Sequence, residues 1–425
     1  MRILIVFGTR PEAIKMAPVV QALRDECGVF EVRVCVTAQH RQMLDSVLEA
    51  FCIQPEFDLD LMRPGQDLGD LTSRALLGVR QVIREWRPDR VLVHGDTTTT
   101  FAASLAAFYE RVPVGHVEAG LRTGDLLSPW PEEFNRRAAC VLSDLHFAPT
   151  SGAQANLLAE GVRADRIFVT GNTGIDALLG ILKRIREDAS LRIELDERLS
   201  FLDPSRKLIL VTGHRRENFG GGMEAICWAL RDLVERFPDI EVVYPVHLNP
   251  NVRSAVDRIL RAEDVVGRDR IHLIEPLDYV PFVHAMSRAH LILTDSGGIQ
   301  EEAPSLGKPI LVMRDTTERP EGVAVGCAIL VGADREKILG GTVRLLTDSA
   351  LYASMAESGN PYGTGDAAHR ITAALRSLRQ ADPVGLRTEN VLPFPDKGVQ
   401  IHELIPQVSN TLQEPAELGV GLPLQ

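Results

Sequence analysis

Short apolar runs alternate with amphipathic stretches along most of this chain. Arg2–Phe7, RILIVF, is a nearly continuous apolar run, which is typical of a strand in a parallel sheet covered on both faces. Leu71–Trp86 instead repeats its apolar residues at helical spacing. Because parallel strands need crossover connections, the repeated alternation predicts an α/β protein with doubly wound, Rossmann-like sheets.

The alternation pauses near Gly171–Gly174 and then restarts with the run KLILVTG. We therefore expect two doubly wound domains of similar size, the first over 1–171 and the second over 172–359. The helix expected at 360–380 would cross back to the first domain. Ligands of such sheets bind beyond the carboxyl ends of the strands, which is where the polar clusters described below fall.

Three stretches depart from the alternation. Cys52–Asp70 is interpreted as a loop and Asp188–Arg206 as a charged connection. From Asp382 onward the chain has six prolines and no clear period. We interpret 381–425 as an appended tail that is disordered or lies along the surface.

The composition excludes several classes of protein. A chain of 425 residues with a net charge of −12 is a poor candidate for nonspecific binding to nucleic acid. No apolar run approaches the length of a membrane span, and the strand starting at Arg2 leaves no room for a signal peptide. The six cysteines form no CxxC pair, so we interpret them as reduced core residues of a cytoplasmic protein.

The stretch Leu291–Gly322 contains the most informative turn. The apolar run LILTD is followed by SGG and then by a short helical stretch. Gly297 and Gly298 would let the backbone approach an anion closely, and free N–H groups at the helix start favour negative charge. The alternative is an ordinary strand-to-helix turn capped by Ser296.

The residues that follow this turn carry charge. Glu301 or Glu302 could accept hydrogen bonds from ribose hydroxyls, and Arg314 and Arg319 would supply fixed positive charge. Together with the glycine turn they predict a nucleotide site.

Cationic side chains also follow two other expected strands. Arg10 lies in the first strand-to-helix turn, GTRPE, with Lys15 about one helical turn later. His214 follows KLILVT directly and could serve as an acid, a base or a phosphate partner. Solvated surface charges and a structural histidine are the alternatives. No HxH or HExxH spacing occurs, so no metal site is predicted.

Three carboxylates form the last candidate cluster. Asp96 and Glu118 end successive strands, and Glu132 begins a helix on which Arg136 lies four residues later. Carboxylates that converge repel each other, which raises the pKa of at least one and suits proton transfer. Alternatively, Asp96 caps the following helix and Glu132 only complements the helix dipole.

The sequences of these motifs and their order along the chain resemble those of one family. The motifs are GTRPEAIKMAPVV, VTAQHRQMLD, VLVHGDTTTTFAASLAAFY, VPVGHVEAGLRTGD, SPWPEEFNRR, VTGNTGIDAL, VTGHRRENFG, YPVHLNPNV, LILTDSGGIQEEAPSLGKPILVMRDTTERPEG and NPYG. They resemble the non-hydrolysing UDP-N-acetylglucosamine 2-epimerases over about Arg2–Arg379, and the tail lies outside the resemblance.

The resemblance implies a GT-B-type fold with the active site in the interdomain cleft. It implies reversible conversion of UDP-GlcNAc to UDP-ManNAc, by elimination of UDP to 2-acetamidoglucal and re-addition, in the supply of surface polysaccharides. It further implies a cytoplasmic homodimer that needs no metal, nicotinamide or other cofactor, and that is activated by its own substrate.

The resemblance also assigns residues to roles. The matching catalytic positions are Lys15, Asp96, Glu118, Glu132, Arg136 and His214. The matching substrate-binding positions are Arg10, Lys15, Asp96, Glu118, His214, Phe282, Ser296, Gly297, Gly298, Glu302 and Arg319, which favours Glu302 over Glu301 for the ribose. The matching allosteric positions are Gln39, Gln42 and His247, whereas Gly65 stands where some members have Arg.

Three other functions stay open at this point. A hydrolysing 2-epimerase would release ManNAc and UDP, although Lys15 argues against it. A glycosyltransferase of the same fold would move the sugar to an acceptor. A catalytically inactive sensor of UDP-sugars would keep the binding residues alone.

Overall fold

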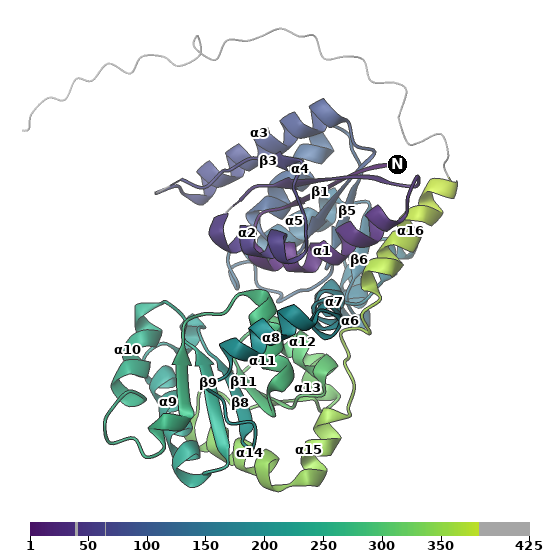
Figure 1. Cartoon of the computed structure of the whole chain (residues 1–425). Helices are drawn as coiled ribbons and strands as arrows, with labels where there is room; N and C mark the ends of the chain where they lie inside the picture. Colours follow the sequence, from purple (N-terminus) through teal and green to yellow (C-terminus); the bar gives the residue numbers. More distant parts are fainter. Residues whose placement is uncertain (39–40, 64, 382–425) are drawn as a thin grey trace, which may run out of the picture. The chain divides into compact units, whose positions relative to one another are not determined.

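Two parallel sheets organise the chain (Figure 1). The computed structural model describes residues 1–38, 41–63 and 65–381. The first sheet has seven strands in the order β3-β2-β1-β4-β5-β6-β7, and the second has six in the order β10-β9-β8-β11-β12-β13. Every strand pair within the two sheets is parallel, so the predicted α/β fold class is confirmed.

The elements around the first sheet alternate as the apolar pattern predicts. Its strands are β1 (Arg2–Phe7), β2 (Glu31–Val36), β3 (Phe57–Asp58), β4 (Arg90–His94), β5 (Val114–Val117), β6 (Leu145–Ala148) and β7 (Ile167–Val169). Its helices are α1 (Arg10–Asp25), α2 (Arg41–Ala50), α3 (Leu68–Trp86), α4 (Thr98–Tyr109), α5 (Glu132–Leu142) and α6 (Ser151–Ala159).

The second sheet repeats the alternation. Its strands are β8 (Lys207–Thr212), β9 (Ile240–Pro245), β10 (Ile271–Ile274), β11 (Leu291–Thr294), β12 (Ile310–Val312) and β13 (Ala328–Leu330). The helices after β7 are α7 (Thr173–Glu187), α8 (Ala189–Arg198), α9 (Gly221–Arg236), α10 (Pro250–Ile259), α11 (Tyr279–Arg288), α12 (Gly297–Glu302), α13 (Pro320–Ala324), α14 (Arg335–Thr347), α15 (Ser349–Ala356) and α16 (Ala367–Ala381).

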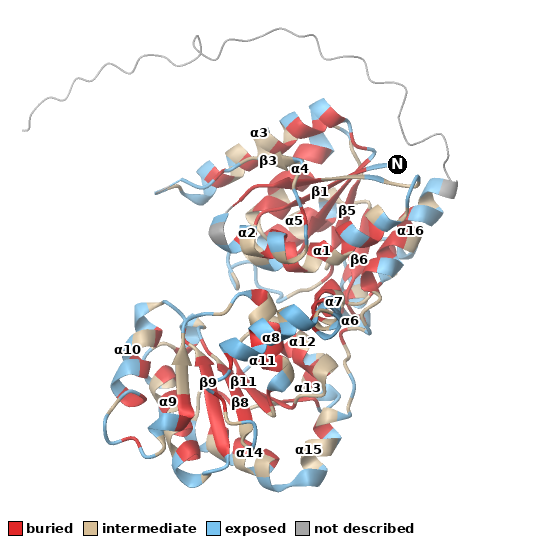
Figure 2. Ribbon diagram, in the orientation of Figure 1, coloured by how far each residue is buried: buried red, intermediate tan, exposed pale blue. Residues whose placement is uncertain are grey.

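Local chemistry explains where these elements begin. The central strands of both sheets are buried, whereas the outer faces of the helices are exposed (Figure 2). Asp67 caps α3 by accepting a hydrogen bond from the Asp70 backbone N–H, and Thr97 caps α4 by accepting one from Thr100. Both side chains stabilise free N–H groups at a helix start.

Two predictions about connecting stretches differ from the structure. The stretch Cys52–Asp70 is not all loop, because Phe57–Asp58 pairs with β2 and α3 begins at Leu68. The connection Asp188–Arg206 contains α8, which Asp188 caps through two backbone N–H groups. Most residues of α8 are exposed and only Leu195 is buried, so the helix has no strong apolar pattern in the sequence.

The cysteine prediction is wrong in part. Cys35, Cys140, Cys227 and Cys327 are buried free thiols, as expected for core residues. Cys27 and Cys52 are exposed, because both lie in turns beyond the ends of helices.

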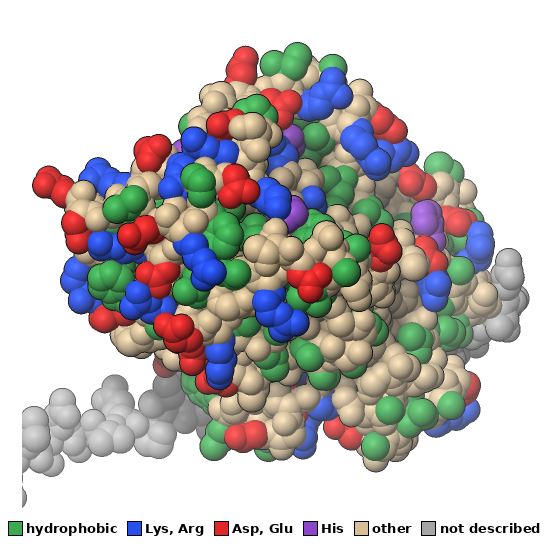
Figure 3. Space-filling view, turned by 90° about the horizontal axis from the view of Figure 1, so that it is seen from below, with side chains coloured by type: hydrophobic (Ala, Val, Ile, Leu, Met, Phe, Trp, Pro, Cys, Tyr) green, Lys and Arg blue, Asp and Glu red, His purple; other side chains and the backbone are tan. Residues whose placement is uncertain are grey.

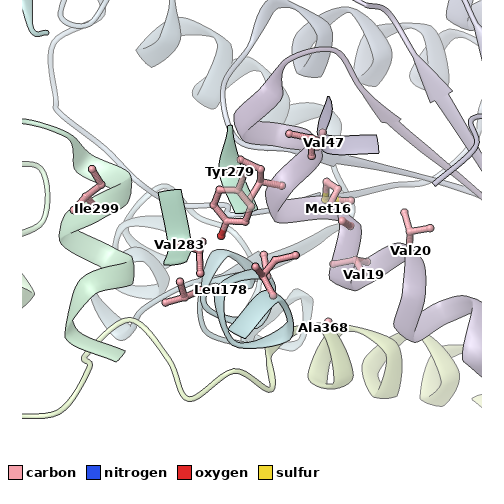
Figure 4. Packing of buried hydrophobic residues seen from close by; sticks show 14 of the residues in the cluster. Met16, Val19, Val20, Val47, Leu178, Tyr279, Val283, Ile299 and Ala368 are labelled. Carbon is pink, nitrogen blue, oxygen red and sulfur yellow. The ribbon is translucent and has the colours of Figure 1, made fainter. Parts of the chain in front are cut away.

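Apolar helix faces pack together beside the sheets. Figure 4 shows Met16 of α1, Leu178 of α7, Val283 of α11 and Ala368 of α16 in one buried cluster. Helix α16 packs against α1, which lies far from it in sequence. The domain limits at 171 and 359 stay predictions, and the tail prediction for 382–425 lies outside the described residues.

Within the described ranges, no helix is long and apolar enough to cross a membrane. On the face drawn in Figure 3, basic and acidic side chains are interspersed.

Candidate functional site

Lys15 lies at the centre of the charged residues that the sequence singled out. It projects from α1, and its Nζ pairs with the carboxylate of Glu118, which directly follows β5. The same Nζ lies 3.3 Å from Oε2 of Glu301 on α12. All three side chains are nearly buried. One ammonium group thus joins a carboxylate that follows a strand of the first sheet to a carboxylate on a helix that follows a strand of the second sheet.

Three more polar side chains complete this arrangement. Asn172 Nδ2 donates to Oε2 of Glu118 at 3.3 Å and to Oε2 of Glu301 at 2.8 Å. Arg319 Nε donates to the other Glu301 oxygen at 2.9 Å. His94 Nε2 lies 3.6 Å from Glu118 Oε2. The six residues form what we call the central cluster: Lys15, His94, Glu118, Asn172, Glu301 and Arg319.

Opposite charges inside the central cluster stabilise each other. Burial alone would lower the pKa of Lys15, but Glu118 and Glu301 raise it above its ordinary value. Burial would likewise raise the pKa of Glu118, but Lys15 and His94 hold it well below its usual range. The expectation that converging carboxylates raise the pKa is therefore wrong for Glu118, because a cation lies between it and Glu301.

The backbone at Glu118 is strained. Its φ is +62°, a value that non-glycine residues seldom adopt. Such strain costs on the order of 1–3 kcal/mol and persists where neighbouring contacts fix the side chain. The pair with Lys15 is such a contact.

Glu302 differs from its neighbour Glu301. Tyr279 Oη donates to its Oε1 at 3.4 Å, and within the described part of the chain its carboxylate forms no ion pair. Burial raises the pKa of Glu302 to about 8, with Lys15 opposing and Glu301 reinforcing this shift. Glu302 therefore favours its protonated form near neutral pH, whereas Glu301 is held by Lys15 and Arg319.

This shift makes protein stability depend on pH. The folded chain keeps a proton on Glu302 that the unfolded chain, with a pKa near 4.5, gives up. The free energy of unfolding should therefore fall as pH rises from about 5 to 8. We expect Glu302→Gln to remove roughly 3–4 kcal/mol of this dependence between pH 5 and pH 8. Urea denaturation at pH 5 and pH 8 measures the free energy of unfolding, with exposed Glu336→Gln as the control. An equal change in this free energy between the two pH values for wild type and Glu302→Gln would refute the prediction.

Asp96 pairs with an arginine instead of capping a helix. Its Oδ2 lies 2.7 Å from Nη2 of Arg136 on α5, and its backbone oxygen accepts a bond from Asn135 Nδ2. Thr97 is the residue that caps α4, so the capping alternative for Asp96 is wrong. The sequence placed Arg136 on the same helix face as Glu132 and did not predict this pair with Asp96.

The two glutamates that begin α5 have different surroundings. Glu133 accepts bonds from the backbone of Thr123 and pairs with Arg136 and Arg137, so it fixes the loop before the helix. Oε2 of Glu132 is buried and has no hydrogen-bond partner among the described residues. A buried oxygen without a partner is costly in a folded protein, which marks Glu132 as a group available to a ligand.

His214 is oriented by a buried aspartate. Asp295, fully buried at the end of β11, accepts bonds from the backbone N–H groups of His214 and Arg215 at 2.8 and 2.9 Å. Its Oδ1 lies 3.4 Å from His214 Nδ1. The imidazole stacks on His247, with ring centroids 5.4 Å apart. Burial lowers the pKa of His214 in spite of Asp295, so the neutral form is favoured.

The SGG turn lies against Arg319. Ser296 is the residue before α12, but its side chain makes no capping hydrogen bond, so that alternative is wrong. A Cβ atom at Gly297 would lie 3.0 Å from Cζ of Arg319. The missing side chain therefore lets the guanidinium group approach the helix start, and Gly298 has open space beside it.

The remaining predicted positions are spread around this centre. Arg10 Nη2 donates to the Leu277 backbone oxygen at 3.4 Å, and Phe282 packs on the apolar cluster of α11. Arg314 does not offer a free charge, because Glu217 and Glu318 both pair with it. Two allosteric predictions fall on undescribed parts: Gln39, and the side chain of Gln42.

Sequence reasoning missed four polar residues. His94, Asn172 and Asp295 contact predicted site residues, as described above, whereas Glu301 was named only as an alternative to Glu302. Buried Glu12 accepts bonds from the backbone of the GTR turn and from Thr97 Oγ1, and so ties that turn to the start of α4. The available signal was position: His94, Asp295 and Asn172 each lie at or just beyond the end of an apolar run.

The rest of the described chain has surface hollows but no candidate metal site. No group of three His, Cys, Asp or Glu side chains in it is arranged to hold a metal ion. Surface hollows of about 640 and 770 Å³ lie beside the end of α4 and beside α2, away from the central cluster.

Comparisons with known proteins agree with the sequence motifs. The family model for UDP-N-acetylglucosamine 2-epimerase matches residues 21–376. A UDP-N-acetylglucosamine 2-epimerase of Yersinia pestis is 60% identical over 89% of this chain and 99% of its own length.

Solved structures give the same result. The Neisseria meningitidis UDP-GlcNAc 2-epimerase bound to UDP-GlcNAc has a TM-score of 0.82 at 50% identity, over 89% of this chain and all of that one. The Methanocaldococcus jannaschii enzyme with UDP-GlcNAc and UDP has a TM-score of 0.73 at 33% identity, with the same coverage. The chain therefore belongs to the UDP-N-acetylglucosamine 2-epimerase family, which confirms both the resemblance and the expectation of an isomerase.

Proposed function

We propose that this protein interconverts UDP-GlcNAc and UDP-ManNAc without net hydrolysis. The observation that carries the proposal is the central cluster, in which Lys15 holds carboxylates from both sheets beside the SGG turn. A site for a nucleotide sugar needs cations for the diphosphate and a carboxylate for proton transfer in one place. Family membership supports the same assignment.

The proposed reaction has two halves. A base removes the proton from C2 of the sugar, the electron pair forms the C1=C2 double bond, and the C1–O bond breaks to release UDP. The product held in the site is 2-acetamidoglucal. UDP then adds back to C1 while a proton is delivered to the opposite face of C2, so atoms balance and no water is consumed.

Glu118 is the proposed proton carrier nearest the centre of the site. It is ionised, nearly buried and fixed by Lys15, so it can accept a proton without prior rearrangement. Glu132 and Asp96 are proposed as its partners on the proton path. The free oxygen of Glu132 supports this role, and Arg136 holds Asp96 in place.

The departing diphosphate requires positive charge. We propose that Arg319, Arg10 and the N–H groups of Ser296–Gly298 bind it, and that His214, held by Asp295, contacts it as it leaves. Lys15 would support the developing charge from the Glu118 side. Glu302 would bind the ribose and Phe282 would lie by the uracil.

Proton NMR of the purified enzyme with UDP-GlcNAc in D₂O tests the function. We expect UDP-ManNAc carrying deuterium at C2, with no accumulation of free ManNAc. Free ManNAc plus UDP would instead identify a hydrolysing epimerase. An unchanged spectrum with UDP-GlcNAc bound would identify a sensor or a transferase that lacks its acceptor.

We also propose that the enzyme works in the cytoplasm, supplies surface polysaccharide synthesis and is activated by UDP-GlcNAc bound beside the active site. His247 stacks on His214, which supports coupling between a ligand at His247 and the reacting site. The proposed activator would contact Gln39 and Gln42 as well.

We propose a homodimer formed through α3, α4 and α5. These neighbouring helices expose large apolar side chains, among them Leu77, Phe108, Tyr109 and Val141, the last at 85% exposure. We expect Val141→Glu to halve the mass measured by light scattering, because a buried charge opposes association. Ile193→Glu on α8 is the control. A monomeric wild type would contradict the dimer, and a dimeric Val141→Glu would contradict this surface.

A further inference from the structure

The motif NPYG has no part in the function described so far. It forms the segment Asn360–Gly363, called here the NPYG segment, which precedes α16. Its tyrosine is buried, although it lies in a connection between helices. The side chains of Asn360 and Tyr362 and the backbone of Tyr362 all have hydrogen-bond partners in or beside the central cluster.

The phenol of Tyr362 fixes the loop that carries Arg319. Tyr362 Oη donates to the Arg319 backbone oxygen at 2.9 Å and accepts from the Gly322 backbone N–H at 2.9 Å. Burial raises the pKa of this phenol, so it remains a donor throughout the neutral range. One hydroxyl therefore holds both the residue that carries the guanidinium group and the first turn of α13.

The side chain of Asn360 fixes the other member of the Glu301–Arg319 pair. Asn360 Nδ2 donates to the Glu301 backbone oxygen at 2.8 Å and to Ser305 Oγ at 2.6 Å. Its Oδ1 accepts from the Tyr362 backbone N–H at 2.8 Å, so the two side chains hold a single arrangement.

The backbone of the segment fixes a third residue of the central cluster. The Tyr362 carbonyl accepts a bond from the Asn172 N–H at 2.8 Å, and the side chain of Asn172 bridges Glu118 and Glu301. Gly363 allows this approach, because its φ is +145° and a Cβ there would lie 3.4 Å from Asn172 N.

We propose that Tyr362 is a positioning residue, which sets Arg319 and, through the NPYG segment, Glu301 and Asn172 in the geometry that binds the diphosphate of UDP. It touches no reacting atom. This inference rests on the proposed function, because it assigns the diphosphate to Arg319. Its physical basis is preorganisation: a cation held in place by its backbone binds an anion without first having to be ordered.

Tyr362→Phe tests the inference, because it keeps the ring and removes only the hydroxyl. Tyr352→Phe is a matched control: Tyr352 Oη also donates to a backbone oxygen at 2.9 Å, that of His290, outside the site. Calorimetric titration with UDP should give a Kd about tenfold higher for Tyr362→Phe, with a comparable rise in KM, and a Kd within about twofold of wild type for Tyr352→Phe. Thermal unfolding of both variants measures the loss of stability.

Equal UDP affinity for wild type and Tyr362→Phe would overturn the inference, as would an equal loss of affinity in Tyr352→Phe. Asn360→Ser, which loses the bonds to Glu301 and Ser305, should also raise the Kd and provides the answer if Tyr362→Phe does not fold. A wild type that neither binds UDP nor epimerises UDP-GlcNAc would contradict the proposed function itself, which separates the two failures.

Discussion

Glu118→Gln should lower kcat by about 10²- to 10⁴-fold, the usual contribution of a positioned acid or base. Glutamine keeps the shape of the side chain and an oxygen for Asn172, but it cannot take up a proton from C2. Lys15 would retain Glu301 as its counter-ion, so the variant should fold. Steady-state kinetics with UDP-GlcNAc, together with deuterium exchange at C2, measure the effect.

A second buried carboxylate provides the control for this variant. Glu241 accepts a bond from the Asp203 backbone and pairs with Arg206 at 3.3 Å, away from the central cluster. Glu241→Gln should lower the melting temperature while leaving kcat within about twofold of wild type. If Glu118→Gln kept more than a tenth of the wild-type kcat, Glu118 would not be the proton carrier.

Lys15→Met should have the largest effect on stability, because it leaves Glu118 and Glu301 buried without their shared cation. Removing one partner of a buried ion pair costs about 3–5 kcal/mol. Activity should also be lost, since Glu118 would no longer be held ionised. Denaturant unfolding at pH 5 and pH 8 measures the free energy of unfolding of both proteins.

The protonation of Glu118 determines how the stability loss in Lys15→Met should change with pH. In the wild type, Lys15 holds the pKa of Glu118 low, so the stabilisation it gives persists until strongly acidic pH. In Lys15→Met, burial favours the protonated carboxyl of Glu118 and the larger of its two opposing cations is gone, leaving His94, so the loss of stability relative to wild type should shrink as the pH falls from 8 to 5.

Lys308→Met is the control for this variant. Lys308 is half-buried, and burial alone lowers its pKa, so its charge is destabilising. Removing that charge should leave stability unchanged or higher. If Lys15→Met lost little free energy of unfolding relative to wild type, or lost the same amount at pH 5 and pH 8, the ion pair between Lys15 and Glu118 would not be the source of the stability.

The sequence by itself determined the fold class and most of the elements. Buried parallel strands are continuous apolar runs, and the helices between them repeat apolar residues at helical spacing, so both signals are local. The motifs also named the charged residues at strand ends, including Lys15 and Glu118, and the family to which the chain belongs. Helix α8 was not predicted because it buries only one residue, Leu195.

Only the tertiary structure decided what those charges do. Lys15 and Glu301 are far apart in the sequence, as are Arg319 and Tyr362, and nothing in the local pattern pairs them. The same reason explains why Glu301 and Glu302 have different roles and why the charge of Arg314 is neutralised. Charge and hydrogen-bond partners depend on distance in space, which the fold sets, whereas period and capping depend on distance along the chain.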